Sequence, residues 1–193
     1  MTSPLRDTDI RPALRRFVEP ADRSDTVVIE ELGIGRHAVR VDMAVVNGSM
    51  HAYEIKSDFD TLRRLSVQAV HYGKCFDQIT LVIGPKHVKL ARELVPQWWG
   101  LVRVSSHAEG VRLVVARKPK RNPAREARAL IELLWREETI ALLEQRGAAG
   151  GLRSKPREQL WDRATQVFTL EEIATAVRAH LKANAKKLGL AAQ

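Results

Sequence analysis

The chain has 193 residues, enough to bury one core, with or without a helical extension. Its hydrophobic content of 45% and mean hydropathy of −0.25 are ordinary for a globular protein, and no apolar run approaches the ~18–20 residues of a membrane span. The N-terminal stretch MTSPLRDTDIRPALRR lacks the apolar segment of a secretion signal. These features exclude a membrane-spanning protein and predict a cytoplasmic one.

The lone cysteine, Cys75, cannot form an internal disulfide, and no Cys or His cluster has the spacing of zinc ligands. Cys75 falls on the end of an expected helix that is predicted to be buried, and it is interpreted as an unreactive core thiol. A disulfide-stapled or zinc-dependent protein is therefore not expected.

The net charge of +9 is unevenly distributed. Residues 1–116 hold 16 Lys and Arg against 14 Asp and Glu, whereas residues 117–193 hold 16 against 9. Much of the excess lies in RKPKRNPAREAR, residues 117–128. Such a segment commonly binds a polyanion, and the alternative is a solvated linker and helix start. The change in composition predicts an α/β domain over 1–116, a basic linker over 117–123 and a helical domain over 124–193.

Periodicity and turn signals define the elements expected in the first part of the chain. Asn47-Gly48 between two strands is a strong hairpin signal, Asp60 is expected to cap a helix, and Pro85 is placed to start one. In chain order we expect a helix over 7–18, strands over 25–32, 37–46 and 50–57, a helix over 60–76, a strand over 78–84, a helix over 85–95, and strands over 101–106 and 111–117.

The second part of the chain is expected to be all helical. A single long helix is predicted over 124–147, with Gly147 as its stop, followed by a loop and helix over 148–168. Thr169 and Glu172 form the pattern of a capping box at the start of the last helix. Trp135 and Trp161 fall among leucines, which predicts a small helical core. SKPR, residues 154–157, is typical of a helix-start phosphate contact or of a solvated turn.

Asp42, Glu54 and Lys56 lie on the two strands of the predicted hairpin. Carboxylates that hold a divalent cation, with a lysine beside them, suit phosphodiester hydrolysis. Glu54 and Lys56 share a face because they are two apart on one strand. A two-residue Asn47-Gly48 loop would turn Asp42 to the other face, whereas a three-residue loop aligns all three side chains.

A three-residue loop is therefore expected, pairing residue 45 with 49 or 46 with 50. The version with Val46-Asn47-Gly48 as the loop is favoured because it gives Gly48 the left-handed conformation of a common bulge. The same register predicts a core on the opposite face, formed by Val41, Met43, Val45, Tyr53 and Ile55.

The pattern D-x11-E-x-K between two short strands, followed by a helix, resembles the motif of the PD-(D/E)XK nuclease superfamily. Gln68 and Tyr72, which share a helical face, match the Q-x-x-x-Y element of its RecB-like branch. Glu31 resembles the extra acidic residue that often precedes the aspartate, with Glu30 as the alternative. The blocks DTLRRLxxQxxxY and VPQWWG together resemble an uncharacterised bacterial family within that superfamily. One departure is that no proline precedes Asp42.

The resemblance implies a restriction-endonuclease-like α/β core, a mixed sheet flanked by helices, with an all-helical basic C-terminal extension. It implies that Asp42 and Glu54 bind Mg²⁺ or Mn²⁺, with the Ile55 carbonyl and Glu31 completing the metal site. Lys56 would orient or deprotonate the attacking water, and Gln68 and Tyr72 would position water or a phosphate. The residues expected to contact the nucleic-acid backbone are Arg63, Arg64, Lys118, Lys120 and Arg121. For Arg63 and Arg64 the alternative is a solvated helix face.

The leading functional expectation is a Mg²⁺-dependent deoxyribonuclease whose partner is DNA, with RNA left open. One alternative is a nucleic-acid-binding protein that keeps the fold without turnover. Another is an interaction module whose helical tail docks a protein. DNA repair, mobile-element maintenance and phage-related processes all fit the leading expectation. The oligomeric state is left open, a homodimer included.

Overall fold

A computed structural model of the chain describes residues 4–19, 25–108 and 110–187. Six strands form one sheet in the order of the sequence. β3, β4 and β5 run parallel, and the pairs β1–β2, β2–β3 and β5–β6 are antiparallel. The strands are β1 (Val27–Ile34), β2 (Val39–Val46), β3 (Met50–Lys56), β4 (Gln78–Ile83), β5 (Gly100–His107) and β6 (Gly110–Arg117).

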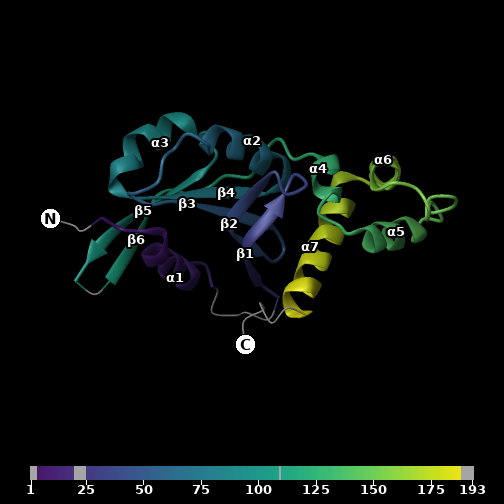
Figure 1. Ribbon diagram of the computed structural model, residues 1–193, viewed down its shortest axis with the longest axis horizontal. Coiled ribbons are helices and arrows are strands. Elements are labelled where there is room, and N and C mark those ends of the chain that lie inside the picture. Colours follow the sequence, from purple (N-terminus) through teal and green to yellow (C-terminus); the bar gives the residue numbers. More distant parts are fainter. Residues whose placement is uncertain (1–3, 20–24, 109, 188–193) are drawn as a thin grey trace.

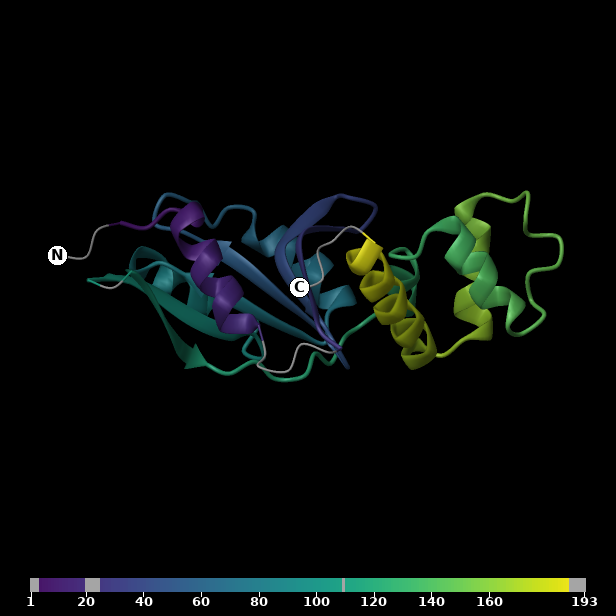
Figure 2. The same cartoon turned by 90° about the horizontal axis from the view of Figure 1, so that it is seen from below.

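Helices cover both faces of the sheet (Figure 1). One face carries α1 (Asp7–Val18), and the other carries α2 (Leu65–Cys75), the 3₁₀ turn η1 (Pro85–His87) and α3 (Val88–Leu94). The remaining helices extend from the β1 end of the sheet (Figure 2): α4 (Ala127–Ile131), α5 (Arg136–Glu144), α6 (Arg157–Val167) and α7 (Leu170–Lys187). The expected α/β class, with a mixed sheet flanked by helices and a helical C-terminal part, is confirmed.

Two apolar clusters lie on opposite faces of the sheet. Met43, Val45, Tyr53 and Ile55 pack beneath α1, as the hairpin register predicts. The other cluster joins the sheet to α2 and also to the C-terminal helices, whose buried leucines continue the same core. The C-terminal helices are thus held on the sheet by apolar burial.

The hairpin between β2 and β3 has a three-residue loop, as expected. Val46 pairs with Met50, so the loop is Asn47-Gly48-Ser49 and not the favoured Val46-Asn47-Gly48 version. Gly48 does not adopt a positive φ. The turn is closed instead by Asn47, whose Oδ1 accepts the Ser49 N–H at 2.9 Å. An Asn side chain that bonds two residues ahead replaces the left-handed glycine here.

Side chains along β1 and β2 alternate between the two faces of the sheet, and this alternation reverses where Glu31 lies opposite Asp42. Glu31 has a φ of 54°, a left-handed conformation that is rare for residues with a side chain. On β1, Ile29 and Leu32 consequently pack on the same face although they are three residues apart. On β2, Val41 joins the cluster of α2 rather than that of Met43 and Val45, so its predicted position is wrong.

The start of α2 and the predicted helix over 124–147 differ from expectation. Asp60 does not cap α2, which begins at Leu65; its Oδ2 instead accepts bonds from the Ser57 N–H and hydroxyl, at 2.8 and 2.6 Å. The long helix is divided between α4 and α5, because Trp135 is extended (ψ 169°). The break lets the leucines of both segments face one core and leaves Trp135 56% exposed, so its predicted burial is wrong.

Other local predictions are confirmed. Trp161 and Cys75 are buried. The backbone N–H of Thr169 bonds Glu172 Oε2 at 2.8 Å, and the Thr169 hydroxyl accepts the Glu172 N–H, which completes the capping box. Within the part of the chain that the structure describes, no helix is long and apolar enough to cross a membrane.

Candidate active site

Asp42 lies where β2 and β3 separate. Their last backbone pair is Met43 with Tyr53, and beyond it the Asp42 carboxylate enters the gap, where Oδ2 accepts the Ile55 N–H at 2.6 Å. A backbone donor that would otherwise lack its strand partner is thereby satisfied. The Asp42 side chain remains 22% exposed and lines the cavity described below.

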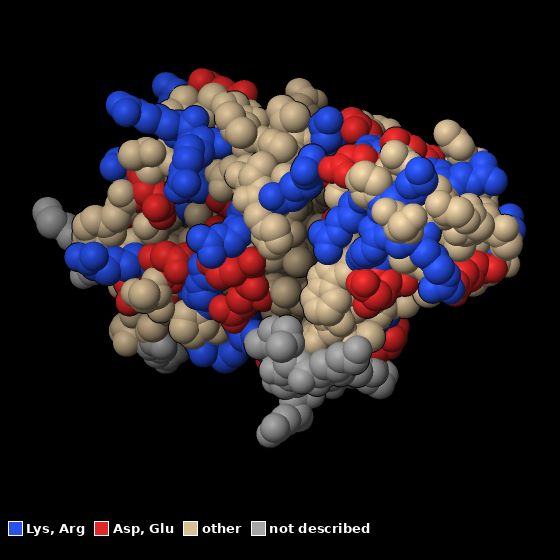
Figure 3. Space-filling model, turned by 45° about the vertical axis from the view of Figure 1, so that its right-hand side comes forward, with Lys and Arg blue, Asp and Glu red and all other residues tan. Residues whose placement is uncertain are grey.

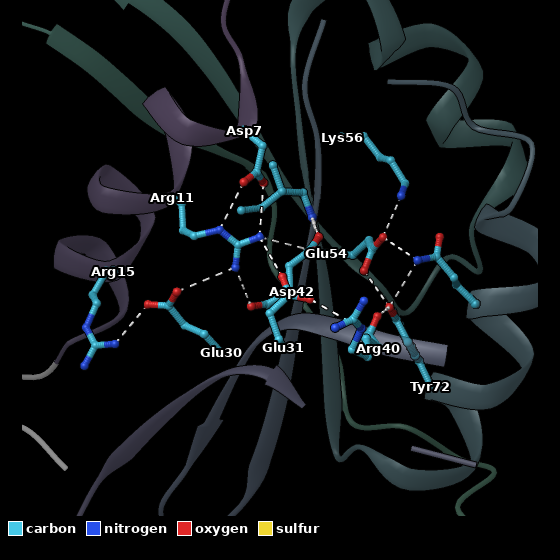
Figure 4. Close-up of polar contacts among 12 residues, drawn as sticks. Asp7, Arg11, Arg15, Glu30, Glu31, Arg40, Asp42, Glu54, Lys56 and Tyr72 are labelled. Atoms are coloured by element: carbon cyan, nitrogen blue, oxygen red, sulfur yellow. Dashed lines mark hydrogen bonds and ion pairs between the residues drawn. The ribbon is translucent and has the colours of Figure 1, made fainter. Parts of the chain in front are cut away.

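Glu54 is buried and fully engaged by three neighbours (Figure 4). Its Oε1 accepts bonds from Lys56 Nζ and Gln68 Nε2, each at 2.6 Å. The Tyr72 hydroxyl lies 2.5 Å from Oε2, and it also lies 2.7 Å from the Arg40 carbonyl oxygen. Burial, followed by the charge of Glu54, raises the pKa of Tyr72, which keeps the hydroxyl a donor. The five residues predicted to form one site therefore do meet.

The Asp42 carboxylate is poorly solvated. Burial and the nearby charge of Glu54 raise the pKa of Asp42 to about 7. The Ile55 N–H, Lys56 and Arg11 oppose that rise without cancelling it. A group with this pKa is only partly ionised at neutral pH, and an added cation would favour its charged form.

Asp42, Glu54, Lys56 and Gln68 line an open cavity of about 530 Å³. Of the basic residues expected to contact nucleic acid, Arg64 lines this cavity, whereas Arg63, Lys118, Lys120 and Arg121 do not. Arg121 instead pairs with Glu171 at 3.2 Å. The other lining residues are Asp7, Arg11, Glu31, His37, Ala38, Val39, Arg40, Ile55, Asp60 and Val67.

Arg11 of α1 is a site residue that the sequence did not indicate. Its Nη1 donates to the Asp42 carbonyl at 2.9 Å, and its Nη2 lies 3.0 Å from Glu31 Oε1 and 3.6 Å from Asp42 Oδ1 (Figure 4). Asp7, one helical turn earlier, fixes the guanidinium through Nε at 3.0 Å. The helical pattern over 7–18 placed Arg11 on a helix, but no local signal says which strands that helix crosses.

Glu31 lines the cavity but faces two arginines, Arg11 at 3.0 Å and Arg40 at 3.6 Å. Glu30 also lies on the α1 side, where Arg15 bonds it at 3.0 Å and Arg11 Nη1 is 3.7 Å away, but it does not line the cavity. Of the two acidic residues considered upstream of Asp42, Glu31 is thus the one at the cavity. Its left-handed backbone, which costs roughly 1 kcal/mol or more, holds it there.

Few oxygen donors are available to a cation at this site. Among the described residues, no group of three or more His, Cys, Asp or Glu is arranged to hold a metal ion. Of the carboxylates that line the cavity, Asp7 and Glu31 are paired with Arg11 and Asp60 is bonded to Ser57. The remaining donors are the carboxylates of Asp42 and Glu54 and Gln68 Oε1, which is buried without a hydrogen-bond partner. Mg²⁺ is commonly held by one or two carboxylates, with water and phosphate oxygens supplying the rest, so the donor set fits this ion in kind.

Comparison with known proteins places the chain in a family. Residues 13–188 match the family described as Bacteriophage P4 protein cII. The chain belongs to that family. Protein cII of Enterobacteria phage P4 is 30% identical over 148 residues, which cover 76% of this chain and 56% of that protein. The chain therefore spans little more than half the length of this curated relative. The solved structure of SPO1766, a protein of unknown function from Silicibacter pomeroyi, matches 74% of this chain and 89% of its own, with 20% identity and a TM-score of 0.41.

Proposed function

We propose that this cII-family chain is a metal-dependent nuclease that hydrolyses DNA phosphodiester bonds. The observation that carries the proposal is the meeting of Asp42 and Glu54 beside Lys56 at the point where β2 and β3 separate. Two carboxylates that are close enough to repel each other, one buried and one largely buried, raise the free energy of the folded protein unless a cation offsets their charge. The raised pKa of Asp42 is the sign of that cost.

Asp42, Glu54 and the Ile55 carbonyl would hold Mg²⁺ or Mn²⁺, with Gln68 Oε1 facing the same ion or a water beside it. Glu31 lines the same cavity and would contribute if it released Arg11. When bound, the cation would supply Lewis-acid polarisation of the phosphate and of the attacking water. We also propose that the sheet is a restriction-endonuclease-like core.

Lys56 is the residue to which we assign charge stabilisation. Its Nζ lies 2.6 Å from Glu54, and its side chain is 7% exposed. An ammonium held in a poorly solvated position interacts strongly with charge that develops on a phosphate. It can also orient the attacking water by hydrogen bonding.

Gln68 and Tyr72 are positioning residues in this proposal. Gln68 Nε2 holds Glu54 Oε1 at 2.6 Å, and Tyr72 holds Oε2 at 2.5 Å. Both come from one face of α2, so the helix fixes the carboxylate orientation from one side. Rigid support of this kind is what a catalytic carboxylate requires.

DNA is the proposed substrate because the cavity is open and has arginines on its lining. Arg40 and Arg64 both lie there, and such side chains bind phosphates through charge and hydrogen bonds. The excess of basic residues over 117–193 would add to that attraction. A role in mobile-element or phage-related DNA processing is in keeping with a family named after a phage protein.

A second candidate function, DNA binding without turnover, is favoured by one observation. Every oxygen of Glu54 is already bonded within the protein, and Arg11 already lies beside Asp42. A protein that compensates its own carboxylates in this way would bind DNA without a divalent cation.

The distinguishing experiment is a titration of Mg²⁺ and Mn²⁺ against linear, circular and single-stranded DNA. Wild type is compared with Asp42→Ala and Lys56→Ala. Metal-dependent cleavage that both variants lose supports the nuclease, and the substrate profile separates nicking from attack at ends. Salt-sensitive binding with intact DNA at every metal concentration would instead support the second candidate.

A further inference from the structure

A second and larger cavity, of about 670 Å³, lies between β1 and the C-terminal helices. Ile29 and Leu32 of β1, with Leu181 of α7, form apolar walls. Trp135 and Trp161 add aromatic surface. Figure 3 shows this side of the molecule, where uncharged side chains lie in a hollow flanked on both sides by groups that contain basic and acidic side chains. Apolar cavities of several hundred Å³ with a few polar groups are typical ligand sites.

Trp135 is the residue that most needs explanation. It is 56% exposed at the break between α4 and α5, although its ring is held edge-on against His180, with centroids 5.4 Å apart. An ordered, exposed indole leaves apolar surface in water, which costs free energy unless a ligand covers it. A flat aromatic partner would do so by stacking.

The polar groups of this cavity suit a base that carries a phosphate. Arg36 pairs with Glu158 at 3.4 Å, and Glu132 pairs with Arg128 at 3.1 Å, so both acidic residues of the lining are already engaged. Arg157, at the start of α6, has no ion-pair partner among the residues that the structure describes. The exposed guanidinium of Arg157 is thus available to bind an anion. Asn184 Nδ2 lies 2.9 Å from His180 Nε2, so its Oδ1 and its second amide N–H are what the side chain offers to the edge of a base.

The second cavity adjoins the candidate active site at one turn. His37 lines both cavities, and Arg36 beside it lines the second. Arg36 has a φ of 59° and His37 has a φ of 66°. Their turn is closed by a hydrogen bond from the Ala38 N–H to the Gly35 carbonyl at 3.1 Å. Non-glycine residues in this conformation are strained and are frequent at functional sites. His37 packs closely over Gly33, where a Cβ would lie 2.2 Å from its Nδ1. The turn that separates the two cavities is therefore held in place by close packing.

We propose that the second cavity binds an unpaired nucleobase joined to a phosphate, with Trp135 stacking on the base and Arg157 contacting the phosphate. The favoured source is a single-stranded stretch of the nucleic acid whose neighbouring phosphate lies in the site of Asp42 and Glu54, which rests on the proposed function. Bases inside a duplex are stacked and paired and cannot enter such a cavity. The other source of the same chemistry is a free mononucleotide.

The test is the binding of a labelled single-stranded oligonucleotide in EDTA, where no cleavage occurs, followed by fluorescence anisotropy. The proteins are wild type, Trp135→Ala, Trp135→Phe and Phe17→Ala. Phe17 is a matched control because it is an aromatic residue, 44% exposed, on α1 and outside both cavities. A second oligonucleotide with abasic sites keeps the phosphates and removes the bases. A duplex and deoxyadenosine monophosphate complete the set.

We expect Trp135→Ala to weaken single-strand binding roughly tenfold, Trp135→Phe to weaken it less, and Phe17→Ala to leave it unchanged. Abasic sites should weaken wild-type binding by a similar factor and should add little to Trp135→Ala. Duplex binding should not respond to Trp135. Equal binding by wild type and Trp135→Ala, or equal binding of abasic and complete strands, would overturn the proposal.

If Trp135→Ala weakens binding of the mononucleotide but not of the single strand, the cavity binds a free mononucleotide and not a stretch of single-stranded nucleic acid. These readouts need no cleavage. A wild type that binds bases through Trp135 but never cuts DNA would refute the nuclease and leave the base site standing.

Discussion

The hydroxyl of Tyr72 lies 2.5 Å from Oε2 of Glu54, which joins α2 to β3 across 18 residues of chain. The same hydroxyl lies 2.7 Å from the Arg40 carbonyl, so it also connects β2. One buried side chain thus ties together the three elements that carry the candidate site.

Tyr72→Phe should therefore destabilise the protein more than the loss of a tyrosine hydroxyl that bonds a neutral group. Removing the hydroxyl leaves a buried carboxylate oxygen unsatisfied, which costs about 1–3 kcal/mol. Tyr53→Phe is the matched control, because Tyr53 is also buried but bonds a neutral group, His51 Nδ1, at 3.2 Å. Urea unfolding of the two variants at pH 8 measures the difference. Equal losses would mean that Tyr72 does not hold the Glu54 carboxylate.

The raised pKa of Asp42 predicts that the free energy of unfolding falls as the pH rises. Burial and Glu54 raise this pKa from 3.8 to about 7, so the folded protein holds a proton that the unfolded chain has released within that window. Stability is therefore lost as pH rises from about 4 to 7, at most ~1.4 kcal/mol per pH unit from this group. Without divalent cations, Asp42→Asn should become progressively more stable relative to wild type over that range. Asp25→Asn, an exposed control, should show no such trend.

His51 predicts the opposite dependence. Its ring lies between Thr80 Oγ1 at 2.8 Å and the Tyr53 hydroxyl, and burial lowers its pKa from 6.5 to about 4. Below pH 6.5 the unfolded chain takes up a proton that folded His51 does not. The contribution of His51 to stability is therefore complete above pH 6.5 and is lost as pH falls toward 4. Urea unfolding should show wild type losing stability relative to His51→Gln between pH 7.5 and 4.5. A difference independent of pH would show that His51 is solvated.

Divalent cations should stabilise the wild type through the same carboxylates. A ligand that binds only the folded state at ten times its Kd adds about 1.4 kcal/mol to the free energy of unfolding. We expect Mg²⁺ or Mn²⁺ at pH 8 to raise the Tm of wild type and of the control Asp25→Asn, whose exposed carboxylate pairs with Lys182 outside the cavity. Asp42→Asn should show little shift. Equal shifts in all three proteins would place the bound cation elsewhere.

Short-range patterns were enough to predict the core of the site. The parity of the hairpin aligned Asp42 with Glu54, and i, i+4 spacing aligned Gln68 with Tyr72, because strand and helix periods are fixed by backbone geometry. Arg11 was missed because its position depends on how α1 crosses the sheet, which no local pattern encodes.

Predictions also failed where tertiary packing overrides local preference. The break before Trp135 follows a run of good helix formers, and only the need of α4 and α5 to bury leucines in one core explains it. The reversal of faces at Glu31 likewise depends on a left-handed backbone at a residue type that seldom adopts one.

The most direct test of the nuclease proposal is a paired measurement on Lys56→Ala: Mn²⁺ affinity by calorimetry and DNA cleavage rate in the same buffer. Lys56 donates to Glu54 but is not a metal ligand, so the variant separates cation binding from chemistry. We expect Lys56→Ala to bind Mn²⁺ as tightly as wild type or more tightly, since a competing cation beside Glu54 is gone, and to lose at least about a hundredfold in cleavage rate. Cleavage by Lys56→Ala at the wild-type rate would contradict it, and so would a wild type that binds Mn²⁺ at Asp42 and Glu54 but leaves every DNA substrate intact.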